Sequence, residues 1–527
     1  MPSDRLPPVG KAYLVGAGPG DPGMLTLRGV ECLRRADVVL YDYLVNQEIL
    51  RHASEHAEQI CLGQHGKTRI WRQAEINEEL VKRGLAGQQV VRLKGGDPTI
   101  FARGSEELGA LQAAGVPCEL VPGVTAATAV ASCAGISLTD RDQASAVALI
   151  TGQESYGKQK PAMNYHGLAS FPGTLVFYMG VTTAPTWTRQ LLLAGKAPDT
   201  SAAIVRRCSL PDQQTIYCRL DEVADRVAEE GIRPPAMIIV GEVTRSMGSP
   251  SWFERRPLFG VRILITRPLG QVEQLRQPLL ELGADVLAHP MIQIDPPESW
   301  APVDRACSDF SQYDWLVFSS ANGVRFLLER LRAIGKDARA LGSLRIAAIG
   351  PGTSRELSRF QLDADLQPSE FRAESLAAEL VEGAADRRFL LARASRGREV
   401  LAEQLRAAGG IVDQVVVYRS SDAHQLQPDI QQQFVHGQID WVTVTSSAIA
   451  RALVYLAGPQ LHQCKLASIS PLTSSTLRDC GFEPDAEATQ YTMPGVVQAI
   501  REAVVACQDQ VQQPTTTGAH FDPASSR

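Results

Sequence analysis

The first stretch whose residues could do chemistry is a glycine-rich loop near the N-terminus. Residues 13–23, "YLVGAGPGDPG", combine an apolar run with the G-x-G-x-x-G spacing of dinucleotide-binding loops. Asp42 follows at about the 20-residue distance of the acidic residue that binds the ribose of NAD. However, Pro19 and Pro22 remove two N–H groups that a pyrophosphate would use. The spacing therefore leaves open an NAD-dependent dehydrogenase, a turn without ligand, or a loop for a different ligand.

Two further loops could complete a binding site. The stretch 90–108 contains Gly95 and Gly96, which allow close approach of a backbone to a ligand, followed by Asp97. A carboxylate there would accept hydrogen bonds from hydroxyl or ammonium groups and would repel phosphate. The stretch 119–135 turns at a Pro-Gly pair, and Thr125 precedes a series of small residues. Small residues are equally typical of a closely packed helix, so this third loop is ambiguous when taken alone.

These loops follow apolar runs that alternate with helical patterns at 24–35, 78–83 and 105–114. Such alternation predicts an α/β fold, in which ligands bind beyond the carboxyl ends of the strands. The composition changes at 244–260, and a new strand pattern begins at 261, which predicts a domain boundary. Beyond it, stretches that begin at 262, 313 and 345 are similar to stretches that begin at 388, 439 and 465. This ordered repeat predicts two similar α/β lobes.

Composition excludes several classes of protein. A chain of 527 residues is too long for one core, and its net charge of −6 argues against bulk nucleic-acid binding. We find no signal-peptide pattern and no apolar run long enough to predict a membrane span. The ten cysteines form no C-x-x-C and no zinc spacing, so we expect no metal and mostly buried thiols in a reducing cytoplasm.

The first half resembles a known family. In order, "VGAGPGDPGMLTLRG", "YD", "RLKGGDPTIFARGSEE", "VPGVTAA" and "FYMG" are similar to the uroporphyrinogen-III C-methyltransferases of the tetrapyrrole methylase family, over residues 9–246. The resemblance implies a two-lobed α/β fold that binds S-adenosylmethionine between its lobes. By position it implies these cofactor-binding residues: Pro19, Gly95, Gly96, Asp97, Ile100, Thr125, Ala126, Met179, Cys208 and Ala236. Cys208 stands where the family usually has glycine, so we expect its contact to be through backbone.

The resemblance also implies catalytic and substrate-binding residues. Asp42 matches the family's proton acceptor, although an aspartate at a strand end can equally cap a turn. Gln64 stands where the family has a lysine, which puts that proton-donor role in doubt. Lys67 and Arg69 lie in a basic loop suited to a carboxylate-rich substrate. An ordinary solvated loop is the alternative.

The second half resembles uroporphyrinogen-III synthase over residues 258–506, through "ILITRP", "WLVFSSANGV", "IAAIGPGTSREL" and "VTVTSS". We expect a linker at 247–257, one lobe from 258–295 with 420–506, another from 296–419, and a disordered tail at 507–527. Tyr418 matches a family tyrosine suspected of assisting departure of the hydroxyl. Hydroxyl and amide side chains after strands are candidates for substrate binding, with helix capping as the alternative: Ser319, Ser320, Asn322, Thr353, Thr445 and Ser446.

Together the two resemblances predict one bifunctional enzyme. It would cyclise hydroxymethylbilane to uroporphyrinogen III with loss of water, then methylate the product twice to precorrin-2 for sirohaem or cobalamin. We expect small-molecule tetrapyrrole substrates, no nucleic acid, no membrane, a cytoplasmic location and a homodimer through the methyltransferase. The alternatives are a methyltransferase fused to a non-catalytic tetrapyrrole-binding module, or the NAD-dependent dehydrogenase.

Overall fold

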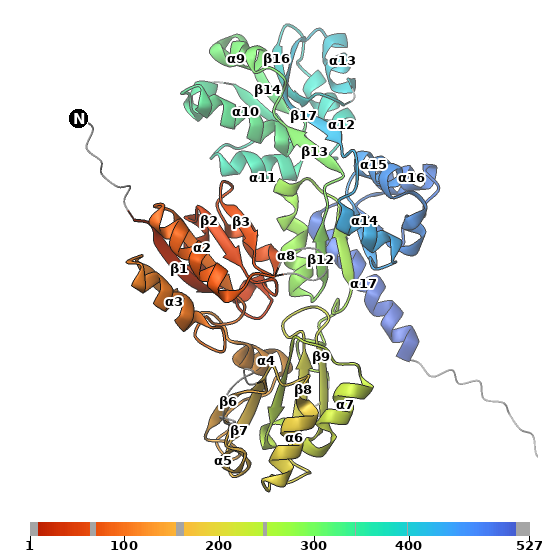
Figure 1. The fold of residues 1–527 in the computed structure, drawn as a ribbon. Helices are drawn as coiled ribbons and strands as arrows, with labels where there is room; N and C mark the ends of the chain where they lie inside the picture. Colours follow the sequence, from red (N-terminus) through yellow and green to blue (C-terminus); the bar gives the residue numbers. More distant parts are fainter. Residues whose placement is uncertain are drawn as a thin grey trace, which may run out of the picture. The chain divides into compact units, whose positions relative to one another are not determined.

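The structure, a computed structural model, describes residues 9–63, 70–153, 163–245, 250–342, 344–397 and 399–512. The chain divides into two compact units, one made of residues 1–261 and 279–285, the other of residues 262–278 and 286–527. Within the described ranges each unit contains two five-stranded sheets with helices packed against them (Figure 1). Both halves therefore have the predicted α/β architecture.

The first sheet of the first unit is parallel, with strand order β3-β2-β4-β1-β5. Its strands are β1 (Lys11–Gly16), β2 (Val38–Tyr41), β3 (Glu58–Cys61), β4 (Gln89–Lys94) and β5 (Cys118–Val121). Helix α1 (Leu27–Arg34) covers one face, and α2 (Gln73–Leu85) and α3 (Gly104–Ala113) cover the other. Because every strand runs the same way, the loops that follow the strands lie at one edge.

The second sheet is mixed, with strand order β6-β7-β10-β8-β9. Its strands are β6 (Val147–Thr151), β7 (Thr174–Tyr178), β8 (Ser201–Arg206), β9 (Gln214–Arg219) and β10 (Ala236–Val240). Helix α4 (Ala126–Ala134) packs on one face, and α5 (Tyr165–Ala169), α6 (Ala184–Leu193) and α7 (Val223–Glu229) pack on the other. Since α4 begins shortly after β5, it brings the loop edge of the first sheet to the second sheet.

The second unit contains a third sheet with order β12-β11-β18-β19-β20. Its strands are β11 (Arg262–Ile265), β12 (Asp285–Ala288), β18 (Trp441–Val444), β19 (Lys465–Ser468) and β20 (Ala486–Glu487). Its helices are α8 (Glu273–Glu281), α14 (Pro428–Val435), α15 (Ser447–Ala457), α16 (Pro471–Asp479) and α17 (Met493–Gln512). Helices α14, α15 and α16 share one buried apolar cluster with this sheet.

The fourth sheet has order β13-β17-β16-β14-β15. Its strands are β13 (Ile292–Asp295), β14 (Trp315–Phe318), β15 (Arg345–Ala348), β16 (Arg388–Ala394) and β17 (Ile411–Asp422). Helices α9 (Ala301–Ser308), α10 (Ala321–Ala333) and α11 (Pro351–Arg359) cover one face, and α12 (Ala373–Val381) and α13 (Val400–Ala407) cover the other.

The sequence repeat corresponds to this topology. In the repeated stretches β11 corresponds to β16, β18 to β14 and β19 to β15. The strands β11-β18-β19 are neighbours in the third sheet, and β16-β14-β15 are neighbours in the same order in the fourth. The third sheet combines the first half of one repeat with the second half of the other, so the chain crosses between the sheets twice. It does so between β12 and β13, and again after β17.

Two local expectations differ from the structure. The predicted helix at 24–35 begins at Leu27, because Pro22–Met24 forms a separate short 3-10 turn capped by the Asp21 side chain. Helix α17 continues to Gln512, past the predicted start of a disordered tail at 507, and the remaining tail lies outside the described residues. No helix in the described part of the chain is long and apolar enough to cross a membrane.

Candidate functional site

The three glycine-rich loops of the first unit pack backbone against backbone at the carboxyl edge of the first sheet. Gly18 and Gly96 exchange two hydrogen bonds: the Gly96 N–H donates to the Gly18 carbonyl at 2.8 Å, and the Gly18 N–H donates back at 3.2 Å. A Cβ on Gly123 would lie 2.3 Å from the Gly96 carbonyl oxygen, so a side chain there would displace the loop. These glycines therefore serve loop-to-loop packing.

The first loop has few free N–H groups for a pyrophosphate. The Gly18 N–H is used by Gly96, the Asp21 N–H donates to Ser209 Oγ at 3.0 Å, and the Gly23 N–H donates to Asp21 Oδ1 at 2.7 Å. Pro19 has no N–H to offer. A dinucleotide loop needs such groups to point at the phosphates. The geometry therefore argues against the NAD-dependent dehydrogenase.

Open space remains on the side of Gly95 and Gly96. A Cβ on Gly95 would meet only Leu44 Cβ, at 4.0 Å, and a Cβ on Gly96 only the Ala126 nitrogen, at 3.9 Å. Two apolar side chains follow strands of the same unit and are half exposed: Phe101, 43% exposed, and Met179, 48% exposed.

Phe101 and Met179 also have positive φ angles, of 50° and 52°. Such backbone strain is concentrated at functional sites. The backbone of Gly95 and Gly96, the apolar side chains of Phe101 and Met179 and the hydroxyl of Thr125 suit a ligand with both polar and apolar parts, as S-adenosylmethionine has.

Asp97 is held by hydrogen bonds within its own loop and to the third loop. Its Oδ1 accepts hydrogen bonds from the Thr99 N–H, at 2.8 Å, and from the Thr99 hydroxyl, while its Oδ2 accepts from the Gly123 N–H at 3.0 Å. The side chain is 9% exposed. Asp97 therefore ties the second loop to the third, and any ligand contact uses only its remaining acceptor capacity.

Tyr178 joins the two sheets of the first unit and was missed in the sequence. Its hydroxyl lies 2.7 Å from Thr125 Oγ1 and accepts from the Ala127 N–H at 3.0 Å, which caps the N-terminus of α4. The Phe101 ring packs against it, with centroids 5.0 Å apart. Tyr178 belongs to the motif "FYMG" quoted above, but only its neighbour Met179 was singled out there.

The remaining predicted cofactor residues divide into two groups. Ile100 and Ala126 pack at the edge of the buried cluster between α4 and the second sheet, and Pro19 lies half-buried in the first loop. Cys208 is 7% exposed in that same cluster, and its hydrogen bond with Cys133 and its burial raise its pKa. Ala236 packs on the opposite face of the sheet, with α6. The side chains of Cys208 and Ala236 thus pack inside the protein, and their cofactor contacts stay predictions.

Asp42 lies directly beside the open glycines. Its Oδ2 accepts a hydrogen bond from the Gly95 N–H at 3.3 Å, and its Oδ1 accepts from the guanidinium of Arg92. The Arg92 side chain is 3% exposed and the Asp42 side chain is 35% exposed. The predicted proton acceptor is thus held in one orientation, with one side open to solvent and adjacent to the predicted cofactor residues.

A buried charge network stands behind Asp42. Glu107 on α3 is fully buried and accepts hydrogen bonds from Arg92 Nε, at 3.1 Å, and from Lys94 Nζ, at 2.8 Å. Gln73 Nε2 donates to the same carboxylate at 3.2 Å. Burial, followed by the charge of Arg92, lowers the pKa of Lys94. With Asp42 the network contains two positive and two negative groups, and it reaches solvent at Asp42.

Three residues discussed above lie outside the described residues. These are Gln64, which stands at the family's lysine position, and Lys67 and Arg69, which were expected to bind substrate. Their predicted roles stay predictions. Within the described ranges no cluster of three histidine, cysteine or carboxylate side chains could hold a metal ion.

In the second unit, two predicted residues line one cavity of about 250 Å³ in the lobe of the fourth sheet. Ser319 and Tyr418 face it together with Arg393, Arg396 and Gln414. The hydroxyl of Tyr418 lies 3.0 Å from Ser320 Oγ, and its ring stacks on Phe326 at a centroid distance of 5.7 Å. The lining of this cavity thus includes one tyrosine and two arginines.

The other predicted residues of this unit have local structural partners. Ser320 and Ser446 cap α10 and α15, where they accept from the Gly323 and Ile449 N–H groups. Thr445 is half-buried before that cap, and Thr353 is buried in the first turn of α11. Asn322 Oδ1 accepts from Gln271 Nε2 at 3.0 Å. Both serines therefore cap helices, as the alternative interpretation predicted. Asn322, at the start of α10, instead contacts Gln271 in the loop after β11.

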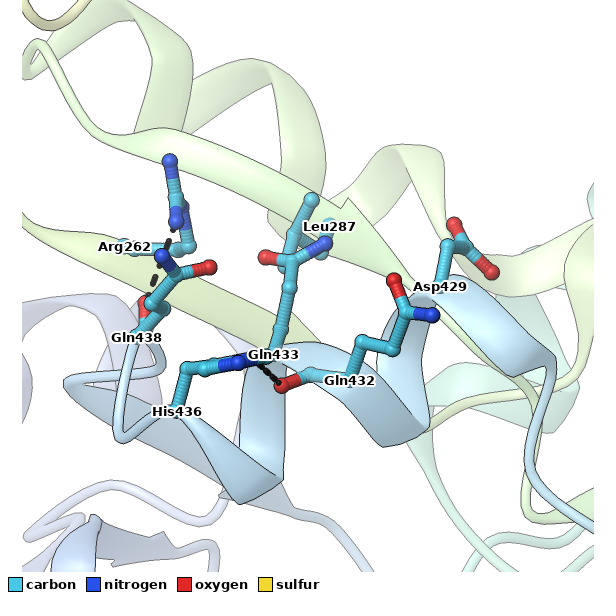
Figure 2. Close-up of a pocket in the computed structure, with 7 residues that line it drawn as sticks. All are labelled: Arg262, Leu287, Asp429, Gln432, Gln433, His436 and Gln438. Atoms are coloured by element: carbon cyan, nitrogen blue, oxygen red, sulfur yellow. Dashed lines mark hydrogen bonds between the residues drawn. The ribbon is translucent and has the colours of Figure 1, made fainter. Parts of the chain in front are cut away.

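A second cavity of this unit, of about 490 Å³, lies at the amino ends of β11 and β18 in the third sheet (Figure 2). Arg262, the first residue of β11, and Gln438, which precedes β18, line it. The His436 ring nitrogen Nδ1 lies 2.7 Å from the Gln432 carbonyl. Because ligands of open α/β sheets bind at the carboxyl ends, this cavity is not a candidate for the substrate.

Comparison with known proteins matches both halves. Residues 11–224 match the Tetrapyrrole (Corrin/Porphyrin) Methylases, and residues 273–498 match Uroporphyrinogen-III synthase HemD. The porphyrin biosynthesis protein HemD of Ruminiclostridium josui is 35% identical over 446 residues, which are 84% of this chain and 88% of that protein. The chain belongs to the family of fused tetrapyrrole methylases and uroporphyrinogen-III synthases.

Other similar proteins cover the first half. A uroporphyrinogen-III C-methyltransferase of Bacillus subtilis is 39% identical over 53% of this chain and 58% of its own length. The crystal structure of uroporphyrin-III C-methyl transferase from Thermus thermophilus complexed with S-adenyl homocysteine is 41% identical, with a TM-score of 0.39, and covers 45% of this chain and 99% of that chain.

Membership of the family confirms the expected fusion, the fold class and the two enzyme classes, with S-adenosylmethionine as cofactor.

Proposed function

We propose that this enzyme cyclises hydroxymethylbilane to uroporphyrinogen III and then methylates that product twice to precorrin-2. The family supplies the two reaction classes. The observation that supports the methyl transfer most is the contact between Asp42 and the Gly95 N–H, because it places a carboxylate next to the open glycine backbone. A proton acceptor must lie beside the reacting atom to be effective.

The residues of the first unit would act as follows. Gly95, Gly96, Thr125 and Met179 would hold S-adenosylmethionine, which supplies the methyl group when bound. Methylation of a pyrrole carbon makes the ring cationic, so the nearby Asp42 carboxylate would stabilise that charge and accept the proton that leaves. Arg92 keeps the carboxylate in its orientation, and the buried partners of Arg92 keep Arg92 in place.

The second unit would enclose the bilane while its ends join. Tyr418 is the candidate to assist departure of the hydroxyl, since it lines the cavity of about 250 Å³ and its hydroxyl is held by Ser320. Loss of water leaves a reactive electrophile that can close in more than one way, so the main task of the protein is to fix the geometry of the substrate.

Ligand binding separates this proposal from the dehydrogenase alternative. Calorimetric titration of the full-length protein with S-adenosylmethionine should show binding with one site per chain, and titration with NAD or NADP should show none. Binding of NAD in place of S-adenosylmethionine would contradict the proposal. Ligand binding to the second unit without turnover of hydroxymethylbilane would instead favour the tetrapyrrole-binding module.

Tyr178→Phe is expected to weaken S-adenosylmethionine binding about fivefold. The substitution removes the hydroxyl that contacts Thr125 Oγ1 and the Ala127 N–H at the edge of the proposed cofactor site. We expect the binding free energy to weaken by about 1 kcal/mol as a result. Calorimetry of the variant measures the dissociation constant. The matched control is Tyr217→Phe, because the Tyr217 hydroxyl donates a hydrogen bond at the other end of α4, to the Ala134 carbonyl at 3.5 Å. Equal effects of the two substitutions would contradict a local role of Tyr178.

Three further features remain proposals of ours. The enzyme acts in the cytoplasm, it forms a homodimer through the methyltransferase, and precorrin-2 passes to sirohaem or cobalamin synthesis. Small-molecule tetrapyrroles are its substrates, in agreement with both matched families.

A further inference from the structure

Three arginines of the second unit, Arg267, Arg325 and Arg388, have a buried Nε with no hydrogen-bond partner among the described residues. Arg388 still pairs with Asp413 through Nη2, at 3.3 Å, whereas no ion pair joins Arg267 or Arg325 to a described carboxylate. Arg267 follows β11 at its carboxyl end, and Arg325 lies in the second turn of α10, the helix that follows β14. Both therefore lie at the carboxyl edges of their sheets, where α/β proteins bind ligands.

The two arginines belong to one cluster, although they come from different sheets. Arg267 Nη2 donates to Gln271 Oε1, and Gln271 Nε2 donates to Asn322 Oδ1 at 3.0 Å. Asn322 and Arg325 are one turn apart on the same face of α10. A Cβ on Gly270 would lie 3.1 Å from Arg325 Nη1, so the β11 loop approaches this guanidinium closely.

No carboxylate of the described chain pairs with either arginine. Arg267 Nη1 donates to the sulfur of Met493 at 2.6 Å, and burial lowers the pKa of Arg267 to about 10. By contrast, Arg396 at the cavity of about 250 Å³ has its own partner, Asp422, at 2.7 Å. Both residues are partly buried, and the guanidinium carbon of Arg325 lies 5.0 Å from the centroid of the Phe326 ring. Two partly desolvated cations without a carboxylate partner form a cluster that an anion would stabilise.

We propose that Arg267 and Arg325 bind one carboxylate side chain of the linear tetrapyrrole substrate, with Gln271 and Asn322 holding the two guanidinium groups in place. This inference rests on the proposed synthase function. The fork of a guanidinium matches the two oxygens of a carboxylate, and such charge-assisted pairs are about twice as strong as neutral hydrogen bonds. A carboxylate fixed between the loops of the two sheets would orient one ring of the bilane before closure.

The test is steady-state kinetics of full-length Arg267→Met and Arg325→Met with hydroxymethylbilane. Each variant should raise KM about tenfold, the effect of one lost charge-assisted contact, and change kcat less than threefold. Methionine replaces the stem and removes the buried charge, so the thermal midpoint should stay or rise. Methyl transfer to added uroporphyrinogen III should remain at the wild-type rate. The control is Arg339→Met. The side chain of Arg339 is 91% exposed and paired with Asp337, so this substitution should change neither KM nor kcat.

The outcomes separate the two claims. A wild-type protein that does not turn over hydroxymethylbilane overturns the proposed synthase function, and this inference with it. A wild-type protein that turns over, with KM within twofold in both variants, overturns the carboxylate site alone. An equal rise of KM in Arg339→Met also overturns it, because the effect would then come from net charge. If Arg267→Met does not fold, Arg325→Met decides the question by the same criteria.

Discussion

Asp42→Asn is expected to lower the rate of methyl transfer roughly 10²- to 10⁴-fold, the usual contribution of a positioned proton acceptor. The substitution keeps the size of the side chain and one oxygen for Arg92 or the Gly95 N–H, but it removes the negative charge. Binding of S-adenosylmethionine should change little. The measurement is the initial rate of methyl transfer from labelled S-adenosylmethionine to uroporphyrinogen III under anaerobic conditions.

The same strand offers a matched control. Asp37 precedes β2 at the end opposite to Asp42, is exposed, and accepts a hydrogen bond from the Gln89 N–H at 2.7 Å. Asp37→Asn makes the same chemical change away from the glycine loops, and we expect a rate near that of the wild type. If Asp42→Asn retains a rate within threefold of the wild type, Asp42 only stabilises the loop and the turn-capping interpretation is correct.

Glu107→Gln is expected to destabilise the first unit by about 3–5 kcal/mol, since breaking a buried ion pair leaves its partners uncompensated. Glu107 is the buried carboxylate that contacts both Arg92 and Lys94. The measurement is chemical unfolding of the full chain, followed at the transition that shifts when S-adenosylmethionine is added. The ligand identifies the transition of the first unit, because a chain of two units does not unfold in one step.

A neighbouring ion pair on the same helix provides the control. Glu106 pairs with Arg103 at the surface, where both side chains are about half exposed, and Glu106→Gln should cost less than about 1 kcal/mol. A loss from Glu107→Gln no larger than this would contradict the assignment of a buried network.

The pH dependence gives a second signature. The pKa of Lys94 is below its ordinary value of 10.5 in the folded protein, so above the folded pKa the unfolded chain binds more protons. The free energy of unfolding then rises with pH, up to the ordinary pKa of 10.5. Glu107 raises the pKa of Lys94, so in Glu107→Gln this pKa falls further and Lys94 loses its proton at lower pH. The stability difference between wild type and Glu107→Gln should therefore shrink as the pH rises from about 7 to about 10.

The fold was accessible from the sequence because the central strands, such as β1, β4, β7 and β14, are buried on both faces. Apolar runs such as β1 and β4 end in glycine-rich loops, and this pattern predicted the carboxyl edge where the loops meet. The repeat predicted two similar lobes, and the strand orders agree with it. The end of α17 was not predicted, since a polar tail has no apolar pattern to define a boundary.

Side-chain partnerships were less accessible. The carboxylate of Asp97, a predicted cofactor residue, also accepts from the Gly123 N–H of another loop, and no local pattern indicates that contact. Glu107 belongs to a stretch of two glutamates that looks solvated, and only the packing of α3 against β4 distinguishes it from Glu106. Arg267 and Arg325 are far apart in the chain, and the hydrogen bonds through Gln271 and Asn322 that link their loops come from the packing of β11 and α10.

The most direct test of the account is a coupled anaerobic assay of the full-length protein with hydroxymethylbilane and methyl-labelled S-adenosylmethionine as the only substrates. The account predicts a tetrapyrrole of the type III ring arrangement that contains two labelled methyl groups per macrocycle. A product of the type I arrangement alone, without label, would contradict both proposed activities.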